Sequence, residues 1–249
     1  MKFIKVNNTD IYCIENNFSD KKYPLIFVHG AGNTSYTWFH QLTINLPNYF
    51  PLAFDLPGHG RSMGDGFNEI SKYSDFLLLF IDTLGFEDVA LCGHSMGGAI
   101  VLDFALKHAH RLTQLILVGT GAKLRVAQEI LENTKLGVSY SYLAYSPKTD
   151  KLLIEKAEKE FPITSPIVRY NDFIACNNFN VLDKVKTIEC DTTIIVGRND
   201  QLTPIKYAEF LHREIKNSTI KIIDDAGHNV MWENPDEVNN TIINDLMHK

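Results

Sequence analysis

The chain has 249 residues, a formal net charge of −6 and an isoelectric point near 5.8. This length suits one large domain, or one domain with an inserted subdomain. Lysine and arginine are scattered without a dense run, which argues against nucleic acid or an anionic membrane as the main partner.

The first eight residues lack the apolar core of a signal peptide, and no apolar run reaches the roughly 20 residues that span a bilayer. The cysteines show neither a CxxC pair nor metal-ligand spacing. They are Cys13, Cys92, Cys176 and Cys190. We therefore expect reduced thiols and a cytoplasmic protein that holds no metal and is a monomer or homodimer.

Short apolar runs, each followed by turn-forming residues, recur along the chain and predict strands. They cover residues 3–6, 11–14, 25–28, 51–54, 89–92, 115–118, 193–196 and 219–223. The first two read as a hairpin, and most of the others are apolar throughout, as in strands buried on both faces. Helical patterns between them, near 70–84 and 96–107, favour an α/β fold with a mostly parallel sheet and helices on both faces. Right-handed crossovers then bring the carboxyl ends of the strands to one edge, where ligands bind.

Residues 122–186 interrupt this rhythm with a polar, helical pattern punctuated by prolines. They predict an inserted helical subdomain, which leaves residues 1–121 and 187–249 as the core. The last helix has a start signal of its own, with Asn234 as N-cap, Pro235 in the first turn and Glu237 completing a capping box.

The segment Gly93-His94-Ser95-Met96-Gly97 fits G-x-S-x-G between a predicted strand and a predicted helix. In that context the glycines permit a sharp turn that exposes a nucleophilic serine. A glycine-rich helix entry with an unreactive serine gives the same five letters. A catalytic role for Ser95 therefore needs support from further catalytic residues elsewhere in the sequence.

A serine nucleophile needs a base, and the base needs an orienting acid. Asp200 follows the strand at 193–196 and His228 follows the strand at 219–223, in the chain order that this motif requires. Asp224 and Asp225 are rival acids on the connection that carries the histidine. The strand at 115–118 ends in glycines and threonine without a carboxylate, which favours Asp200.

An oxyanion hole requires two backbone N–H groups that point at the developing negative charge. Met96 supplies one, because it follows the nucleophile at a helix N-terminus. Ala31, in the glycine-rich loop His29-Gly30-Ala31-Gly32, is the expected second donor. The remaining early histidines, His59 and His94 among them, are expected to shape loops.

These segments, together with Asp55-Leu56-Pro57-Gly58-His59-Gly60-Arg61-Ser62, resemble the signatures of the α/β-hydrolase superfamily, in family order. The resemblance implies an eight-stranded, mostly parallel sheet with a helical cap, here residues 122–186, inserted after the sixth strand. Serine at position 95 separates the chain from the dehalogenases and epoxide hydrolases of this fold, which use aspartate. Carbon–carbon bond hydrolases of the fold often carry an aromatic residue after the histidine, where this chain has Asn229, with Trp232 nearby.

The sequence-based hypothesis is a serine hydrolase that cleaves a small to medium, uncharged carboxylic ester through an acyl-enzyme, without a cofactor. The competing hypotheses are a thioesterase, a lactonase, a cofactor-free perhydrolase or a carbon–carbon hydrolase, and a ligand receptor without turnover. Aromatic residues of the cap either line the pocket or form the cap's own core, which we favour. They are Tyr140, Tyr142, Tyr145, Phe161 and Phe173.

Overall fold

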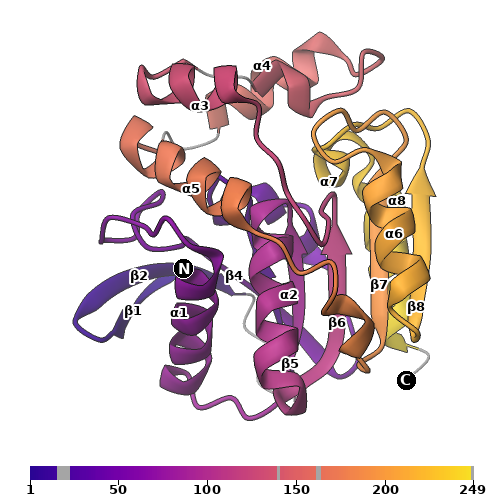
Figure 1. Cartoon of the computed structure of the whole chain (residues 1–249). Helices are drawn as coiled ribbons and strands as arrows, with labels where there is room; N and C mark the ends of the chain where they lie inside the picture. Colours follow the sequence, from indigo (N-terminus) through magenta and orange to yellow (C-terminus); the bar gives the residue numbers. More distant parts are fainter. Residues whose placement is uncertain (16–22, 139–140, 161–163, 248–249) are drawn as a thin grey trace.

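The computed structural model describes residues 1–15, 23–138, 141–160 and 164–247. Eight strands form one sheet in the order β1-β2-β4-β3-β5-β6-β7-β8 (Figure 1). Strands β1 and β2 pair antiparallel, β2 joins β4 antiparallel, and every other pairing is parallel. The strands are β1 (Lys2–Val6), β2 (Thr9–Glu15), β3 (Tyr23–Val28), β4 (Tyr49–Phe54), β5 (Val89–His94), β6 (Leu112–Val118), β7 (Thr192–Gly197) and β8 (Ser218–Ile223). The predicted fold class, including the hairpin, is confirmed.

Both faces of the sheet are buried, because alternate residues of each central strand enter different cores. Ile26 and Val28 belong to one hydrophobic cluster, and Leu25 and Phe27 to the other. The first cluster packs against α1 (Ile70–Thr83), α2 (Met96–His108) and α6 (Ile205–Glu214). The second packs against the short α7 (Val230–Glu233) and α8 (Pro235–Met247).

The start of α8 follows the predicted cap in part. Asn234 accepts the Glu237 backbone N–H at 3.4 Å, but Glu237 returns the contact to the Asn234 side-chain amide at 3.3 Å. The backbone N–H of Asn234 donates instead to the Val230 carbonyl oxygen at 2.9 Å, because α7 ends directly before this N-cap residue.

The segment 122–186 contains α3 (Gln128–Lys135), α4 (Lys151–Glu160) and α5 (Pro166–Asn178). In Figure 1, α3 and α4 lie farthest from the sheet, and α5 lies beneath them above α1 and α2. The two ends of the segment meet at the core. Lys123 and Asn180 form an antiparallel β-bridge there, and the Val181 N–H donates to the Ala122 carbonyl oxygen at 2.8 Å.

No helix among the described residues is long and apolar enough to cross a membrane. All four cysteines are unpaired, and Cys92 is fully buried in β5.

Candidate active site

Ser95 occupies a strained turn between β5 and α2. Its backbone has φ 55° and ψ −115°, a conformation that a residue with a side chain rarely adopts. A Cβ atom at Gly93 would lie 2.3 Å from the Gly97 carbonyl oxygen, and one at Gly97 would lie 2.1 Å from the Val28 carbonyl oxygen. The two glycines are therefore required for the turn to close against β3.

The end of β6 holds this turn in place. The Ser95 N–H donates to the Val118 carbonyl oxygen at 3.0 Å, and the Thr120 hydroxyl donates to the Ser95 carbonyl oxygen at 2.8 Å. These bonds hold the peptide groups on both sides of the strained residue.

Asp200 and His228 form a buried pair at the carboxyl ends of β7 and β8. His228 Nδ1 lies 2.8 Å from Asp200 Oδ2. The carboxylate also accepts the N–H groups of Leu202 and Thr203 at 2.9 and 2.8 Å, and the Thr203 hydroxyl at 2.8 Å. Burial raises the pKa of Asp200, but His228 and the Thr203 contacts outweigh it and leave that pKa below its usual value. The ionised carboxylate therefore keeps a proton on Nδ1 and leaves Nε2 to act as an acceptor.

The rival acids lie elsewhere. Asp224 and Asp225 are exposed and pair with Arg198 and Lys148, respectively. Among the described residues, neither makes a hydrogen bond or an ion pair with His228.

His94 is buried beside His228 and contacts both its ring and its backbone carbonyl oxygen. The rings lie 4.6 Å apart, and His94 Nε2 donates to the His228 carbonyl oxygen at 3.0 Å. Burial, followed by the nearness of His228, lowers the pKa of His94 to about 3. His94 is therefore neutral, and its single ring proton is donated to the His228 carbonyl oxygen, so it does not compete as a base.

Gly119 has a role that the sequence reasoning missed. A Cβ atom there would lie 3.3 Å from His228 Nδ1 and 3.4 Å from Asp200 Oδ2, and its φ of +52° also favours glycine. The absence of a side chain at the end of β6 thus leaves room for the histidine–aspartate pair. Glycine at positions 119 and 121, directly after a predicted strand, is the sequence feature that could have predicted this close approach.

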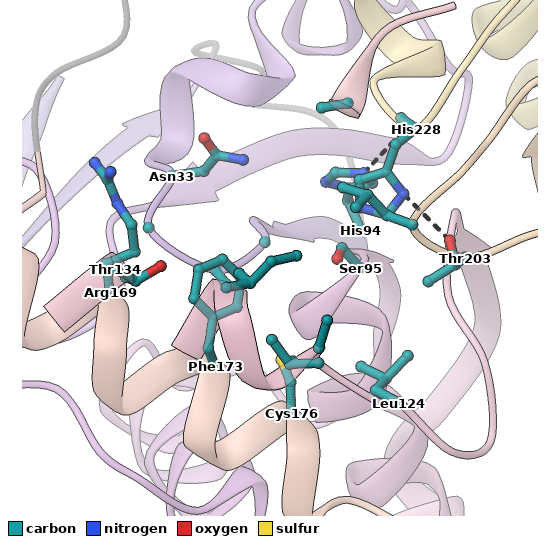
Figure 2. Close-up of a pocket in the computed structure, with 18 of the residues that line it drawn as sticks. Asn33, His94, Ser95, Leu124, Thr134, Arg169, Phe173, Cys176, Thr203 and His228 are labelled. Carbon is teal, nitrogen blue, oxygen red and sulfur yellow. Dashed lines mark hydrogen bonds between the residues drawn. The ribbon is translucent and has the colours of Figure 1, made fainter. Parts of the chain in front are cut away.

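Ser95 and His228 line the same cavity, which has a volume of about 670 Å³. Figure 2 shows both side chains at one end of this cavity, with Thr203 next to the imidazole. Ser95 Oγ makes no hydrogen bond to His228 within the described part of the chain. Such bonds are often long in unliganded enzymes and shorten when substrate binds.

One predicted oxyanion donor lines the same cavity as Ser95, and the other directly follows Ser95 in the sequence. Ala31 lines the cavity, and Met96 is the first residue of α2, so its N–H has no acceptor within the helix.

Of the aromatic residues predicted for the cap, Tyr145 and Phe173 line the cavity. Tyr142 is 65% exposed, so it belongs neither to the cavity wall nor to a core. Tyr140 and Phe161 lie outside the described residues.

A second buried network joins α5 to the loop that carries Ala31. Asp172, which is fully buried, accepts the Gly32 N–H at 2.8 Å and the Tyr73 hydroxyl at 2.6 Å. His59 Nε2 lies 2.7 Å from the same carboxylate, and His59 Nδ1 lies 3.0 Å from the Pro57 carbonyl oxygen. The prediction that His59 shapes a loop agrees with this geometry, but Asp172 was missed.

Glu233 is the second acid that the sequence reasoning missed. Its carboxylate accepts the Gly227 N–H at 2.8 Å and the Ser146 N–H at 2.7 Å. Burial raises the pKa of Glu233, although these hydrogen bonds oppose the rise. Glu233 thus ties the loop before His228 to the segment between α3 and α4.

Within the described ranges, no group of three or more His, Cys, Asp or Glu side chains has the geometry of a metal site.

The parallel sheet, its two helical layers and a cavity at the carboxyl ends of the strands together make the fold of the α/β hydrolases. The model of the alpha/beta hydrolase family matches residues 25–241, and the chain belongs to this family.

Solved structures and curated proteins resemble the chain over nearly its whole length. A thermophilic esterase is 30% identical, with 96% of this chain and 94% of that chain covered and a TM-score of 0.81. A lipase-esterase related protein from Clostridium acetobutylicum is 27% identical, with 94% and 98% covered and a TM-score of 0.82. The 2-hydroxy-6-oxononadienedioate/2-hydroxy-6-oxononatrienedioate hydrolase 1 of Pseudomonas putida is 24% identical, with 99% of this chain and 96% of that protein covered. The family and these relatives support hydrolase activity.

Proposed function

We propose that the protein is a serine hydrolase that cleaves small to medium carboxylic esters through an acyl-enzyme intermediate. The observation that carries the proposal is the strained Ser95 turn in the same cavity as the buried His228–Asp200 pair. The cavity volume of about 670 Å³ lies within the range of small-molecule sites.

In this mechanism His228 Nε2 takes the proton of the Ser95 hydroxyl as Oγ attacks the ester carbonyl carbon. Asp200 holds the Nδ1 proton and stabilises the imidazolium that forms. The backbone N–H groups of Ala31 and Met96 bind the oxyanion. The carbon–oxygen bond then breaks, and the imidazolium gives its proton to the leaving alkoxide. A water molecule, deprotonated by His228, releases the acid and regenerates Ser95.

We assign residues 122–186 as the cap over this site. Side chains of α3 and α5, Thr134 and Phe173 among them, line the cavity together with residues from the strand ends. The backbone contacts at Lys123 and Val181 close the base of the insertion. The cap therefore selects what reaches Ser95.

A carbon–carbon hydrolase is the second candidate, because the Pseudomonas putida relative is named as a hydrolase of 2-hydroxy-6-oxononadienedioate. Asn229 is the cavity residue next to His228. Trp232 instead donates its indole N–H to the Thr37 carbonyl oxygen at 2.9 Å and packs in the second core. The residue that follows the histidine into the cavity is thus an amide and not an aromatic side chain, which favours ester cleavage.

The test is the hydrolysis of p-nitrophenyl acetate and butyrate by the wild type and by Ser95→Ala. We expect the variant to stay folded and to lose turnover, and a fluorophosphonate probe to label the wild type but not the variant. Ser71→Ala, on α1 and away from the cavity, is the matched control and retains both activities. Unchanged turnover by Ser95→Ala would refute the proposal, and a single turnover followed by arrest would favour the receptor. Thioesters, lactones and a vinylogous 1,5-diketone in the same panel distinguish an esterase from a thioesterase, a lactonase and a carbon–carbon hydrolase.

A further inference from the structure

An arginine without a partner lies in the wall of the cavity. Arg169, on α5, is half-buried and lines the cavity that contains Ser95. Within the described ranges its guanidinium has no hydrogen bond and no ion pair. A half-buried cation without a partner has lost hydration that an anionic ligand can replace.

The charge of Asp172 acts on Arg169, but Asp172 is already paired with His59. Its carboxylate binds Gly32, Tyr73 and His59. Both ring nitrogens of His59 face oxygen acceptors, so this imidazole donates from both and is positively charged. The Asp172–His59 pair is therefore neutral overall, and the charge of Arg169 is left over.

The charge of the cavity differs in sign from that of the whole chain. Among the described residues, no aspartate or glutamate lines the cavity, whereas Arg169 and the exposed Arg125 do. The chain as a whole carries −6. Burial lowers the pKa of Arg169, although an arginine stays protonated at neutral pH. The positive charge is thus a local feature of this cavity.

The arginine is held against the loop that carries the oxyanion donor. A Cβ atom at Gly32 would lie 2.9 Å from both Cγ and Nε of Arg169, so glycine at this position makes room for the arginine. The Gly32 N–H is in turn fixed by Asp172, one turn further along α5. In Figure 2, Arg169 and Asn33 lie on one side of the cavity, and Ser95 and His228 on the other.

We propose that Arg169 binds a carboxylate of the substrate, so that the ester cleaved at Ser95 is an anion such as the monoester of a dicarboxylic acid. This inference rests on the proposed function, and it replaces the uncharged substrate expected from the sequence. The planar guanidinium fork suits a bidentate contact to a carboxylate, and the cavity separates that contact from the reacting carbonyl.

The experiment compares kcat/KM for monoethyl and diethyl esters of succinic, glutaric and adipic acids at neutral pH and fixed ionic strength. We expect the wild type to prefer the monoanion of at least one acid over its diester. Arg169→Met should lower this monoester-to-diester ratio by about 10- to 100-fold, the range for a lost hydrogen bond to a charged group. Arg169→Lys, which keeps the charge but not the fork, should restore part of the ratio.

Arg125→Met is the matched control, because it removes the same charge from an exposed position on the same cavity. Solvent and salt screen an exposed charge, so the ratio should change by less than about threefold. An equally large change in this control would overturn a local carboxylate site.

Two further results would overturn the inference. One is a wild type that turns over diesters as well as monoesters, and the other is an Arg169→Met variant that loses both equally. If no ester is cleaved at all, the proposed function fails, and calorimetric titration with glutarate decides the inference on its own. Binding by the wild type that weakens at least tenfold in Arg169→Met supports it, and an absence of binding refutes it.

Discussion

The buried carboxylate of Asp172 offers a sharp test of how the cap is joined to the core. Asp172→Asn keeps the shape of the side chain and removes its charge. The amide oxygen can still accept the Gly32 N–H, and the amide nitrogen faces the Tyr73 hydroxyl, which must then accept where it now donates. The partner that loses most is therefore His59, which is fully buried.

The cost follows from the two acceptors around His59. Without the carboxylate, the imidazole either stays charged without a counter-ion or gives up one proton. In the second case, either the Pro57 carbonyl oxygen is left without a donor, or the introduced amide oxygen loses the His59 contact and keeps only the Gly32 N–H. Breaking a buried ion pair costs about 3–5 kcal/mol, and a buried acceptor without a donor costs about 1–3 kcal/mol. We expect a loss of about 3 kcal/mol, which for a chain of this size lowers Tm by about 6–12 °C.

The loss depends on pH in a defined direction. Burial lowers the pKa of His59, but Asp172 raises it by charge and hydrogen bonding, so that the folded-state pKa lies above the usual 6.5. The stabilisation is therefore complete below about pH 6.5 and is lost as the pH rises through the folded-state value. We expect urea unfolding, measured from pH 6 upward, to show the largest difference in the free energy of unfolding between wild type and variant at the lowest pH.

Asp82→Asn is the control for this measurement. Asp82 is half-exposed and pairs with Arg111, so its loss should cost less than about 1 kcal/mol. The reasoning fails if Asp172→Asn is no less stable than this control, or if its gap to the wild type does not change with pH.

Two other substitutions test the site around Ser95. Asp200→Asn should lower kcat for p-nitrophenyl esters by about 10⁴-fold, because the amide no longer holds the imidazole tautomer. The lowered pKa of Asp200 also stabilises the fold above about pH 3.8, and this contribution is lost as the pH falls through the folded-state value, so acid unfolding should shift toward neutral pH in the variant. Gly97→Ala would place a Cβ atom 2.1 Å from the Val28 carbonyl oxygen, so urea unfolding should show a loss of at least about 3 kcal/mol. A stability within about 1 kcal/mol of the wild type would contradict the close approach of α2 to β3.

The sequence predicted the elements whose formation depends on residues close to one another in the chain. Apolar runs and turn residues predicted all eight strands, because each strand of a parallel sheet carries its own pattern of burial. The positions of Ser95, Asp200 and His228 followed from the rule that strand ends meet at one edge. The G-x-S-x-G motif, the chain order and the absence of a carboxylate after the strand at 115–118 then selected these three residues among those at the strand ends.

The contacts that the sequence did not predict join the inserted segment to the core. Asp172 meets His59 and Gly32 across 113 and 140 residues of chain, respectively. Nothing in the helical pattern around 172 distinguishes this carboxylate from one that faces solvent. The docking of α5 decides it, and the same docking turns Arg169 into the cavity.

Arg169 and Asp172 lie three residues apart on α5, so one helical turn both fixes the loop that carries Ala31 and presents the cation to the substrate. If this turn shifts, both contacts change together. Asp172→Asn should therefore lower the preference for monoesters over diesters as well as the stability. Asp200→Asn should slow both substrates by the same factor, because it acts on a step that they share. A monoester preference that survives in Asp172→Asn would show that the cation is positioned without this anchor.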